Sequence, residues 1–592
     1  MKKLLAMLLA LAMVLGLAAC GGTTESAAEA PASESVAVEA PAEDAPAAEG
    51  EGPVADDNAV EAEGSVVEEA PVEEAAEDDG LITTDYTYEL PLFEPGEFTF
   101  SMWVSFSDNM STFMPNQFAD NLGYKKSVEM TGVEVDMECV STAANSEQFN
   151  LRVASGDLPN VITNVAQLWT TSWDSAIEDE VFIDIADIMP YMPAYSECYE
   201  QLDDQTKADL HTDEGYMPKL ISINNYPDGA TEGAFVRTDY LEEIGMEIPE
   251  TYDDLDKVLR AFQSELGLTE PLMAVSGLVH TSNALVSGFG VWGGFSTFPF
   301  NADPYYVVDG EVKFGIIEEG YKEYMEMFHT YYEDGIISPD FMSKNTNPMD
   351  FIGTISSGTT GVFFGETNMV PNYIEQGQGI DPDFAIAPLA PITKTAGEVT
   401  HFGTETSPIS GRLAGIAIST AEVDLEKLGK YLDFFFTYEG SLLTAMGVEG
   451  NEDGSYIFDE EGNLQYSDNY NNSELSEMEK PTYFIYSVLP MLCPETPSSF
   501  TMDLQHECAP TWDKNADSAW KMPGVTLTAD ENDEYNSIYA DIRTHLEENL
   551  SKFAVGDRPM EEWDTFIQEI YDLGIEDCIA IQQTAVDRYY AR

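Results

Sequence analysis

Apolar residues follow two kinds of pattern along most of this chain. In some short stretches they alternate with polar residues or run without a break, which predicts β-strands. In longer stretches they recur every three or four positions, which predicts α-helices. The predicted strands are 97–106, 133–140, 158–164 and 411–420, and the predicted helices are 146–157, 251–266, 318–335, 421–437, 560–574 and 576–590. Strands and helices that alternate in this way are typical of an α/β fold.

Turn and cap residues define several of these boundaries. Gly156 follows the last apolar position of a predicted helix, where glycine is the preferred residue. Thr251 opens another helix as its N-cap, with acidic residues in the turn that follows. Asp309-Gly310 is a strong signal for a tight turn, so residues 305–315 are expected to form a β-hairpin.

The first residues of the chain read as a secretory signal. Two lysines precede an unbroken apolar run of 16 residues, Leu4–Ala19, which is shorter than the about 20 residues that cross a membrane. The last four residues, Leu17-Ala18-Ala19-Cys20, resemble the lipobox of bacterial lipoproteins. That resemblance implies cleavage before Cys20 and a diacylglycerol on its thiol. An ordinary signal peptide that ends near an unrelated cysteine is the alternative.

A long acidic segment follows this signal. Residues 21–80 hold 19 Asp or Glu, no Lys or Arg, and no aromatic residue. Such a composition buries too little apolar surface to offset the entropy of ordering. We therefore expect a tether that spans about 40 Å on average even without charge repulsion.

The remainder of the chain is long and strongly acidic. Its 512 residues suffice for two or three domains, and they carry 90 acidic against 23 basic side chains. This charge excludes nucleic acid as a partner, because phosphate backbones would be repelled. The five cysteines of this part are odd in number and lack a CxxC motif, so we expect free thiols, with a Cys493–Cys508 pair as the alternative.

Five stretches, in this order, resemble the large carbohydrate-type extracellular solute-binding lipoproteins of ABC importers. They are "VASGDLPNVI" (153–162), "GAFVRTDYLEEIGMEIPETYDDLDKVLRAF" (233–262), "YYEDGIISPDFM" (331–342), "GTISSGTTGVFFGETNM" (353–369) and "FAVGDRPMEEWDTFIQEIYDLGIEDCIAIQQTAVDRYY" (553–590). Together they extend the resemblance over most of residues 95–592.

The resemblance implies an α/β fold with two lobes joined by a hinge, of the type II periplasmic-binding-protein kind. The expected organisation is a signal peptide at 1–19, a lipid-anchored tether at 20–85, a first lobe from 95–225 plus 390–440, and a second lobe from 235–385 plus 445–592. Ligands of open α/β sheets bind at the carboxyl ends of strands, which is consistent with a site between the lobes.

Signatures of exported enzymes are missing from the sequence. No HExxH and no GxSxG motif occurs. His506-Glu507-Cys508 is followed by Ala509-Pro510, so we expect neither a helix nor a metal site there. The segment 288–293 matches the GxGxxG motif of dinucleotide-binding sites. Prolines follow where the helix of such a site would have to begin, so we do not expect a dinucleotide site there. A glycosidase pair is not excluded by counting, because carboxylates are abundant. We expect a binding protein and no enzyme.

One loop has the spacing of a calcium site. Glu449, Asn451, Asp453 and Glu460 stand at positions 1, 3, 5 and 12 of an EF-hand-like loop, with Gly454 at position 6. The alternative is an ordinary turn that leads into a hairpin over 455–468, and this is the preferred interpretation. A structural calcium is thus a hypothesis, and no other cofactor is expected.

A sugar site needs aromatic faces for the rings and polar side chains for the hydroxyl groups. We therefore sought aromatic residues beside carboxylates and amides at strand ends. The candidate ligand-binding residues are Asp108, Asn109, Asn164, Gln167, Trp169, Glu232, Trp292, Glu366 and Asn368. Asp108 and Asn109 could instead cap the next helix.

Other conspicuous residues are assigned differently. Trp103 lies within a strand and is expected in the core, and Arg237 is expected to pair with Asp239. Trp512 and Trp520 fall in a stretch that reads as a loop.

The sequence thus predicts a monomeric extracellular binding protein, held at the cell membrane by its lipid anchor alone. It would capture a small carbohydrate, expected to be an oligosaccharide, and deliver it by hinge closure to the permease of an ABC transporter. The alternatives are a binding protein for a peptide or a cationic metabolite, or a secreted glycan-active enzyme or adhesin.

Overall fold

The computed structural model describes residues 81–592 with several gaps. The gaps are 107–110, 112–113, 226–228, 275–284, 294–303, 345–347, 405–406, 410–414, 460, 472–479, 486–488 and 495–501. The expected signal peptide, Cys20 and the acidic tether therefore lie outside the described residues, as do Asp108, Asn109 and Glu460. Within the described part, no helix is both long enough and apolar enough to cross a membrane.

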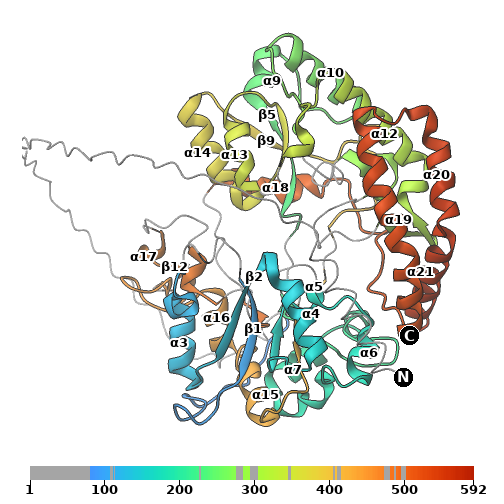
Figure 1. Cartoon of the computed structure of the whole chain (residues 1–592). Helices are drawn as coiled ribbons and strands as arrows, with labels where there is room; N and C mark the ends of the chain where they lie inside the picture. Colours follow the sequence, from blue (N-terminus) through green and yellow to red (C-terminus); the bar gives the residue numbers. More distant parts are fainter. Residues whose placement is uncertain are drawn as a thin grey trace, which may run out of the picture. The chain divides into compact units, whose positions relative to one another are not determined.

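A four-stranded sheet organises the first lobe. Its order is β10–β3–β1–β2, with β1 (Ser101–Phe106) parallel to β2 (Asp136–Ser141) and β3 (Val161–Thr163), and β10 (Ile416–Ile418) antiparallel to β3. The helices of this lobe are α3 (Leu122–Thr131), α4 (Asn145–Ser155), α5 (Val165–Leu168), α6 (Trp173–Glu178), α7 (Pro193–Glu200), α8 (Asp204–Asp209), α15 (Leu425–Phe434) and α16 (Tyr438–Ala445). Figure 1 shows β1 and β2 among α3, α4, α7 and α15.

The predicted strand–helix–strand order is present here, and α4 ends at the predicted glycine. Gly156 terminates α4 in the left-handed conformation, with φ of 70°. Trp103 is fully buried in β1 and donates its indole N–H to Asn145 Oδ1 at 2.8 Å. The expectation of a core role for Trp103 is confirmed.

A three-stranded antiparallel sheet organises the second lobe. Its order is β8–β5–β9, formed by β8 (Val362–Glu366), β5 (Glu232–Arg237) and β9 (Ile386–Leu389). The helices that accompany it are α9 (Thr238–Ile244), α10 (Tyr252–Ser264), α13 (Pro348–Ser356) and α14 (Val370–Ile380). Thr251 caps α10 by accepting a hydrogen bond from the Asp254 amide, as predicted.

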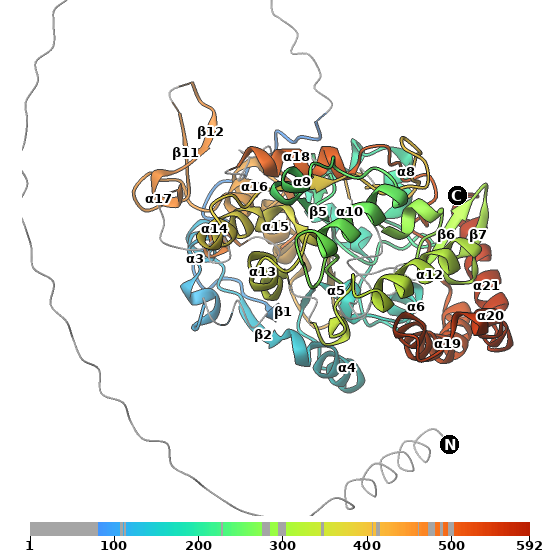
Figure 2. The ribbon, with the colours of Figure 1, turned by 90° about the horizontal axis from the view of Figure 1, so that it is seen from above.

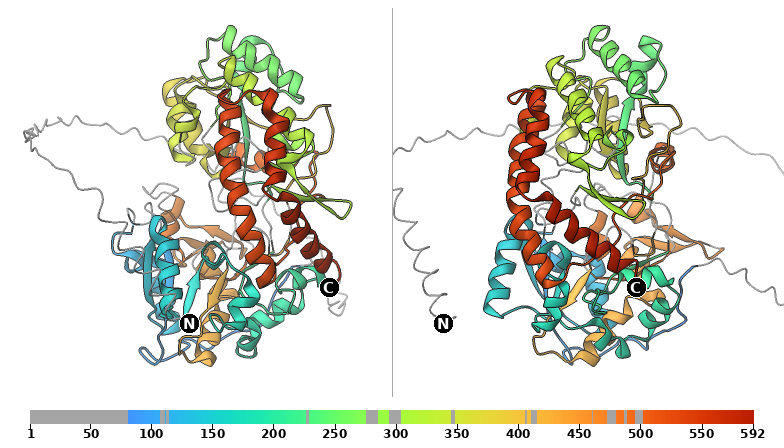
Figure 3. Two further views of the ribbon diagram at one scale, coloured as in Figure 1. Left: turned by 45° about the vertical axis from the view of Figure 1, so that its right-hand side comes forward. Right: turned by 90° about the vertical axis from the view of Figure 1, so that its right-hand side faces the viewer.

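Helix α12 (Glu319–Glu333) and three helices near the end of the chain complete the core of the second lobe. The three are α19 (Ala529–Val555), α20 (Trp563–Asp572) and α21 (Ile575–Tyr589). α19 packs against α12 and α21, and the red helices of Figure 3 lie side by side. Thr528 and Glu531 form a capping box at its start.

Two hairpins occur where they were predicted. In the first, β6 (Tyr305–Val308) pairs with β7 (Glu311–Phe314), and Asp309 and Gly310 both have positive φ, at 53° and 86°. In the second, β11 (Tyr456–Phe458) pairs with β12 (Leu464–Tyr466) and is followed by α17 (Asp468–Asn471). Figure 2 shows this second hairpin and α17 away from both sheets.

The structure corrects one predicted domain boundary. Residues 445–592 were all assigned to the second lobe, but β13 (Leu492–Cys493) pairs with β4 (Ile223–Asn224), and Ile485 and Met491 are buried in the first core. This segment returns to the first lobe because its apolar side chains complete that core. Conversely, Ile392 lies in the core of the second lobe, although 390–440 was assigned to the first.

A second correction concerns the stretch that was expected to be a loop. Residues Asp503–Trp512 form helix α18 with Pro510 inside it. Pro510 lies in the last turn, so few intrahelical hydrogen bonds depend on it. Trp512 is buried and donates its indole N–H to the Ala234 carbonyl at 2.9 Å. Gly233 makes room for this ring, since a Cβ there would lie 2.5 Å from it.

The five cysteines of the described part carry thiols rather than disulfides. Cys198, Cys508 and Cys578 are buried, and burial raises the pKa of the half-buried Cys139 thiol to about 11. These environments are those of inert packing residues rather than reactive ones.

Candidate functional site

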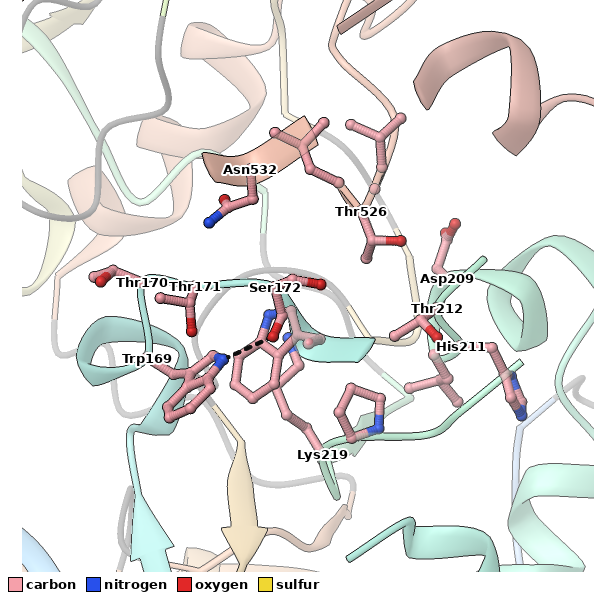
Figure 4. Close-up of a pocket in the computed structure, with 16 residues that line it drawn as sticks. Trp169, Thr170, Thr171, Ser172, Asp209, His211, Thr212, Lys219, Thr526 and Asn532 are labelled. Carbon is pink, nitrogen blue, oxygen red and sulfur yellow. Dashed lines mark hydrogen bonds between the residues drawn. The ribbon is translucent and has the colours of Figure 1, made fainter. Parts of the chain in front are cut away.

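A cavity of about 320 Å³ opens between residues of the two lobes. One wall comes from the first lobe, from the stretch that joins α5 to α6 and from residues that follow α8. The opposite wall is the segment that leads into α19, where Val525 and Leu527 pack against the core of the second lobe. Figure 4 shows Trp169, Ser172 and Lys219 on the first wall, with Thr526 and Asn532 facing them.

Trp169 reaches the cavity because of how β3 ends. Asn164, with φ of 52°, turns the chain directly from β3 into the short helix α5. Trp169 follows this helix, donates its indole N–H to the Ser172 carbonyl at 3.1 Å, and packs edge-to-face on Phe182 at 5.1 Å between ring centroids. With its N–H paired and its ring braced, Trp169 presents a fixed aromatic surface to the cavity.

Lys219, on this wall, has no counter-ion among the residues that the structure describes. Its ammonium lies 4.8 Å from the centroid of the Trp173 ring, a cation–π contact. Among the residues that the structure describes, no carboxylate oxygen lies within 4.0 Å of it. Burial lowers the pKa of Lys219, since removal of water disfavours the ammonium form.

One buried hydroxyl near this wall, that of Ser172, has no hydrogen-bond partner among the described residues. Burial raises the pKa of the nearby Asp174, against the lowering effect of a hydrogen bond with the Thr212 side chain, and Glu214 and Asp213 raise it further. Unsatisfied buried polar groups are uncommon in native proteins and call for a bound molecule or water.

The rim of the cavity is held by the end of α21. Tyr589 donates its hydroxyl to Asp209, which lines the cavity, at 2.5 Å. Arg588 pairs with Asp213 of the first lobe at 2.6 Å and with Glu531 of α19 at 2.6 Å. The C-terminal helix therefore ties together the two segments that form opposite walls.

The structure places only part of the predicted site at this cavity. Trp169 lines it, whereas Asn164 and Gln167 belong to the same turn but are not among its lining residues. Asp108 and Asn109 lie outside the described residues, so their predicted role stays a prediction.

The other predicted ligand residues lie elsewhere. Glu232 and Glu366 face each other in the β5–β8 ladder, at the end of the second sheet, and the exposed Asn368 follows two residues later. Trp292 packs against Phe402, with ring centroids 5.4 Å apart. None of these four residues lines the cavity, and whether they contact ligand stays a prediction.

Sequence reasoning did not select several residues that the cavity brings together. Lys219, Asp209 and Asn532 carry no local signal, because the segments that contribute them are far apart in the sequence.

The calcium-like loop is closed by protein groups. Asn451 donates its side-chain amide to Asp468 Oδ2 at 2.9 Å and accepts from the Asp468 backbone N–H at 2.9 Å. Among the described residues, no group of three or more His, Cys, Asp or Glu side chains is arranged to hold a metal ion. Glu449 and Asp453 are oxygen donors of a suitable kind, so the donor chemistry alone would suit calcium.

Arg237 has the partner that was expected. Its Nε donates to Asp239 Oδ1 at 2.8 Å and its Nη2 to Asp239 Oδ2 at 2.5 Å. The guanidinium lies 3.8 Å from the Tyr240 ring centroid and 4.1 Å from that of Phe384. The Arg237 guanidinium is held by these contacts within the second lobe and is not available to a ligand.

Comparison with known proteins extends these observations. The sequence profile of a family described as bacterial extracellular solute-binding protein matches residues 104–441, more than half of the chain. Over 521 residues the chain is 23% identical to the fructooligosaccharide ABC transporter substrate-binding protein FusA of Streptococcus pneumoniae, an alignment that covers 82% of this chain and 90% of that protein.

Solved structures agree with this relationship at the level of the fold. An extracellular solute-binding protein from Bifidobacterium longum subsp. infantis superposes with a TM-score of 0.68 at 18% identity, covering 84% of this chain and 98% of its own. FusA of S. pneumoniae in complex with kestose superposes with a TM-score of 0.66 at 19% identity, covering 83% and 99%.

The predicted two-lobed α/β fold and the predicted family resemblance are both confirmed. The family is one of substrate-binding proteins and not of enzymes. With two sheets, a cavity walled by residues of both lobes and a matching family profile, this chain belongs to the bacterial extracellular solute-binding proteins.

Proposed function

We propose that this protein captures an oligosaccharide outside the cell and delivers it to the permease of an ABC importer. The observation that carries the proposal is the cavity whose walls come from both lobes and combine indole rings with hydroxyl and amide groups. The relationship to FusA, a fructooligosaccharide-binding protein of the same length class, supports a sugar as the ligand.

The chemistry of the cavity suits a carbohydrate. Trp169 offers an apolar surface for a sugar ring, while Thr171, Thr212 and Asn532 offer donors and acceptors for hydroxyl groups. The volume of about 320 Å³ lies at the lower end of the range typical of ligand pockets. A short oligosaccharide would therefore place one or two residues inside and leave the rest toward solvent.

The mechanism follows from the position of the walls. A ligand that contacts Trp169 of the first lobe and Asn532 at the start of α19 makes all its contacts only when both walls are close to it. Its binding then shifts the population toward the closed arrangement by the difference in affinity between the two states. The protein needs no bond-making chemistry for this task, since the transporter supplies the energy for import.

A non-sugar solute is the second candidate. The ammonium of Lys219, which has no counter-ion among the described residues, disfavours a cationic metabolite at its own wall, whereas Asp209 on the same lining would attract one. A peptide remains compatible with the cavity, so peptides belong in the binding test.

The binding test uses the full-length mature protein and isothermal titration calorimetry. A panel of fructo-, gluco-, galacto- and uronic-acid oligosaccharides is compared with short peptides. We expect binding of at least one oligosaccharide, and Trp169→Ala to weaken it tenfold or more. Binding of peptides alone would overturn the proposal.

A matched variant distinguishes the cavity from the other predicted location. Trp292→Ala removes an indole that does not line the cavity, and its thermal unfolding is checked first. Loss of sugar binding in Trp292→Ala, with Trp169→Ala unaffected, would move the site to the surroundings of Trp292.

The cellular location is part of the same proposal. Cys20 would carry the lipid, and the acidic segment up to about residue 80 would hold the folded part clear of the membrane on the extracellular face. The protein would act there as a monomer beside its permease. A Cys20→Ser variant that stayed in the membrane fraction would contradict the anchor.

A further inference from the structure

Lys219 is an unusual cation for this protein. Beyond residue 80 acidic side chains outnumber basic ones by 90 to 23, so most cations have carboxylates close by. Arg152, Arg260 and Arg588, for example, each pair with two different acidic residues. Lys219 instead lines a cavity, half-buried, with the Trp173 ring as its neighbour.

The isolation of Lys219 carries an energetic cost. A partly desolvated ammonium without a counter-ion is disfavoured, and the lowered pKa of Lys219 reflects that cost. A cation–π contact recovers only part of it. An anion that arrives with the ligand would supply the missing partner.

A second polar group, the Ser172 hydroxyl, belongs to the same wall. The Ser172 hydroxyl is buried, with 4% of the residue exposed, and has no hydrogen-bond partner among the described residues. Figure 4 shows Ser172 and Lys219 on the same side of the cavity, next to Trp169. An ammonium and a hydroxyl together match the two oxygens of one carboxylate.

The surroundings favour a single negative charge over a phosphate dianion. Asp209 lines the same cavity, and the first turn of α19, outside the lining, carries Asp530 and the Glu531 that is paired with Arg588. The capping box of Thr528 and Glu531 also occupies amide groups at that helix start, which would otherwise attract phosphate. One ammonium amid these acids is suited to a monoanion.

We propose that the bound oligosaccharide is acidic, and that Lys219 and Ser172 receive the carboxylate of a uronic acid residue. The proposal rests on the proposed function, because it names the class of sugar for the same cavity. Trp169 would stack on the ring that bears the carboxylate, and the opposite wall would pair with its hydroxyl groups.

Calorimetry with matched ligands tests the proposal. The probes are trisaccharides of galacturonic, glucuronic and mannuronic acid, their methyl esters, and the corresponding neutral trisaccharides. We expect at least one acidic trisaccharide to bind, at least tenfold more tightly than its own methyl ester, because esterification removes only the charge.

Substitution of Lys219 tests whether this residue causes the preference for the acidic sugar. Lys219→Met keeps an apolar chain against Trp173 but removes the charge, and we expect it to weaken binding of the acidic sugar tenfold or more. Lys219→Arg is expected to retain most of the affinity, and Ser172→Ala to lose a few-fold. Lys257→Met, at an exposed lysine on α10, serves as the control and is expected to change nothing.

Failure of this inference can be distinguished from failure of the proposed function. If only neutral trisaccharides bind, or if Lys219→Met binds the acidic sugar as well as the parent does, the inference is overturned while the proposed function stands. If none of the sugars binds and a peptide does, the proposed function itself falls. Circular dichroism of Lys219→Met and Ser172→Ala ensures that a loss of affinity is not a loss of folding.

Discussion

Two cations, the buried Arg237 in the second lobe and the half-buried Lys219 in the first, have different surroundings. Arg237 in the second lobe is 1% exposed, lies between two aromatic rings and pairs with Asp239 through two hydrogen bonds. Lys219 in the first lobe also contacts an aromatic ring, but lines a cavity and has no carboxylate beside it among the described residues.

This difference indicates that the charge of Arg237 stabilises the fold, whereas the charge of Lys219 is available to bind a ligand. The environment of Arg237 supplies a counter-ion without any ligand, although its buried Nη1 has no hydrogen-bond partner among the described residues. The described residues around Lys219 supply no counter-ion, and the open side of the residue is the cavity. A cation whose partner is missing in an acidic protein is evidence for a partner from outside.

The largest expected effect comes from removal of the structural charge. Arg237→Met leaves the Asp239 carboxylate, which is 11% exposed, without its cation. Breaking a buried pair in this way costs about 4 kcal/mol in the free energy of unfolding. Chemical denaturation of the ligand-free protein measures it.

Lys219→Met is the matched substitution in the other lobe. It removes no partner of a protein carboxylate, so we expect the free energy of unfolding to stay within about 0.5 kcal/mol of the parent. If Lys219→Met destabilised the protein as much as Arg237→Met does, the contrast between the two cations would be wrong.

The buried carboxylate of Asp433 is a third charged group to compare with Arg237 and Lys219. It accepts hydrogen bonds from the backbone N–H groups of Ala194 and Tyr195 at 3.0 and 2.8 Å and from the Tyr88 hydroxyl at 2.6 Å, at the start of α7. Burial raises its pKa from 3.8 to about 6, against the lowering effect of these hydrogen bonds.

This shift predicts a pH dependence with a definite sign. Between the unfolded pKa of 3.8 and the folded pKa of about 6, the folded state binds more protons, so its stability falls as the pH rises through that window. Asp433→Asn lacks this titration. We expect the parent to gain about 2 kcal/mol relative to Asp433→Asn when the pH is lowered from 7 to 4.

Denaturation at the two pH values, on both proteins, provides the measurement. Tyr88→Phe sharpens it, because loss of a hydrogen bond to the ionised form should raise the folded pKa further and move the window upward. A difference between parent and Asp433→Asn that is constant with pH would show that Asp433 titrates normally.

Much of the fold could be predicted because its signals are local. The strands around Trp103 and the hairpin at Asp309-Gly310 follow from alternation and turn chemistry within about ten residues. α19 was missed although Tyr535, Tyr539, Ile542 and Leu546 repeat at helical spacing, since the acidic residues between them obscure the stripe. The return of Ile485, Met491 and Leu492 to the first lobe has no local signal and depends on which core they complete.

The candidate site could be predicted only where it coincides with a strand end. Trp169 follows β3, and the rule that ligands bind at carboxyl ends of strands selected it. Lys219 stands before a buried residue with no motif around it, and Asn532 comes from a helix some 300 residues later. Whether a lysine is paired is a property of the folded protein, which no spacing along the chain records.

The smallest expected effect concerns the acidic loop that contains Asn451. Among the described residues, its carboxylates have no cation beside them, much as Lys219 has no anion. Here the protein supplies its own closure, because Asn451 and Asp468 exchange two hydrogen bonds of 2.9 Å. We expect Asn451→Ala to cost about 1 kcal/mol and to make the loop more sensitive to limited proteolysis. Calcium at millimolar concentration should neither raise the melting temperature of the parent nor rescue Asn451→Ala. A rise of several degrees that is reversed by a chelator and absent in Asp453→Asn would establish calcium as the missing partner, and this loop would then join Lys219 as a site completed from outside.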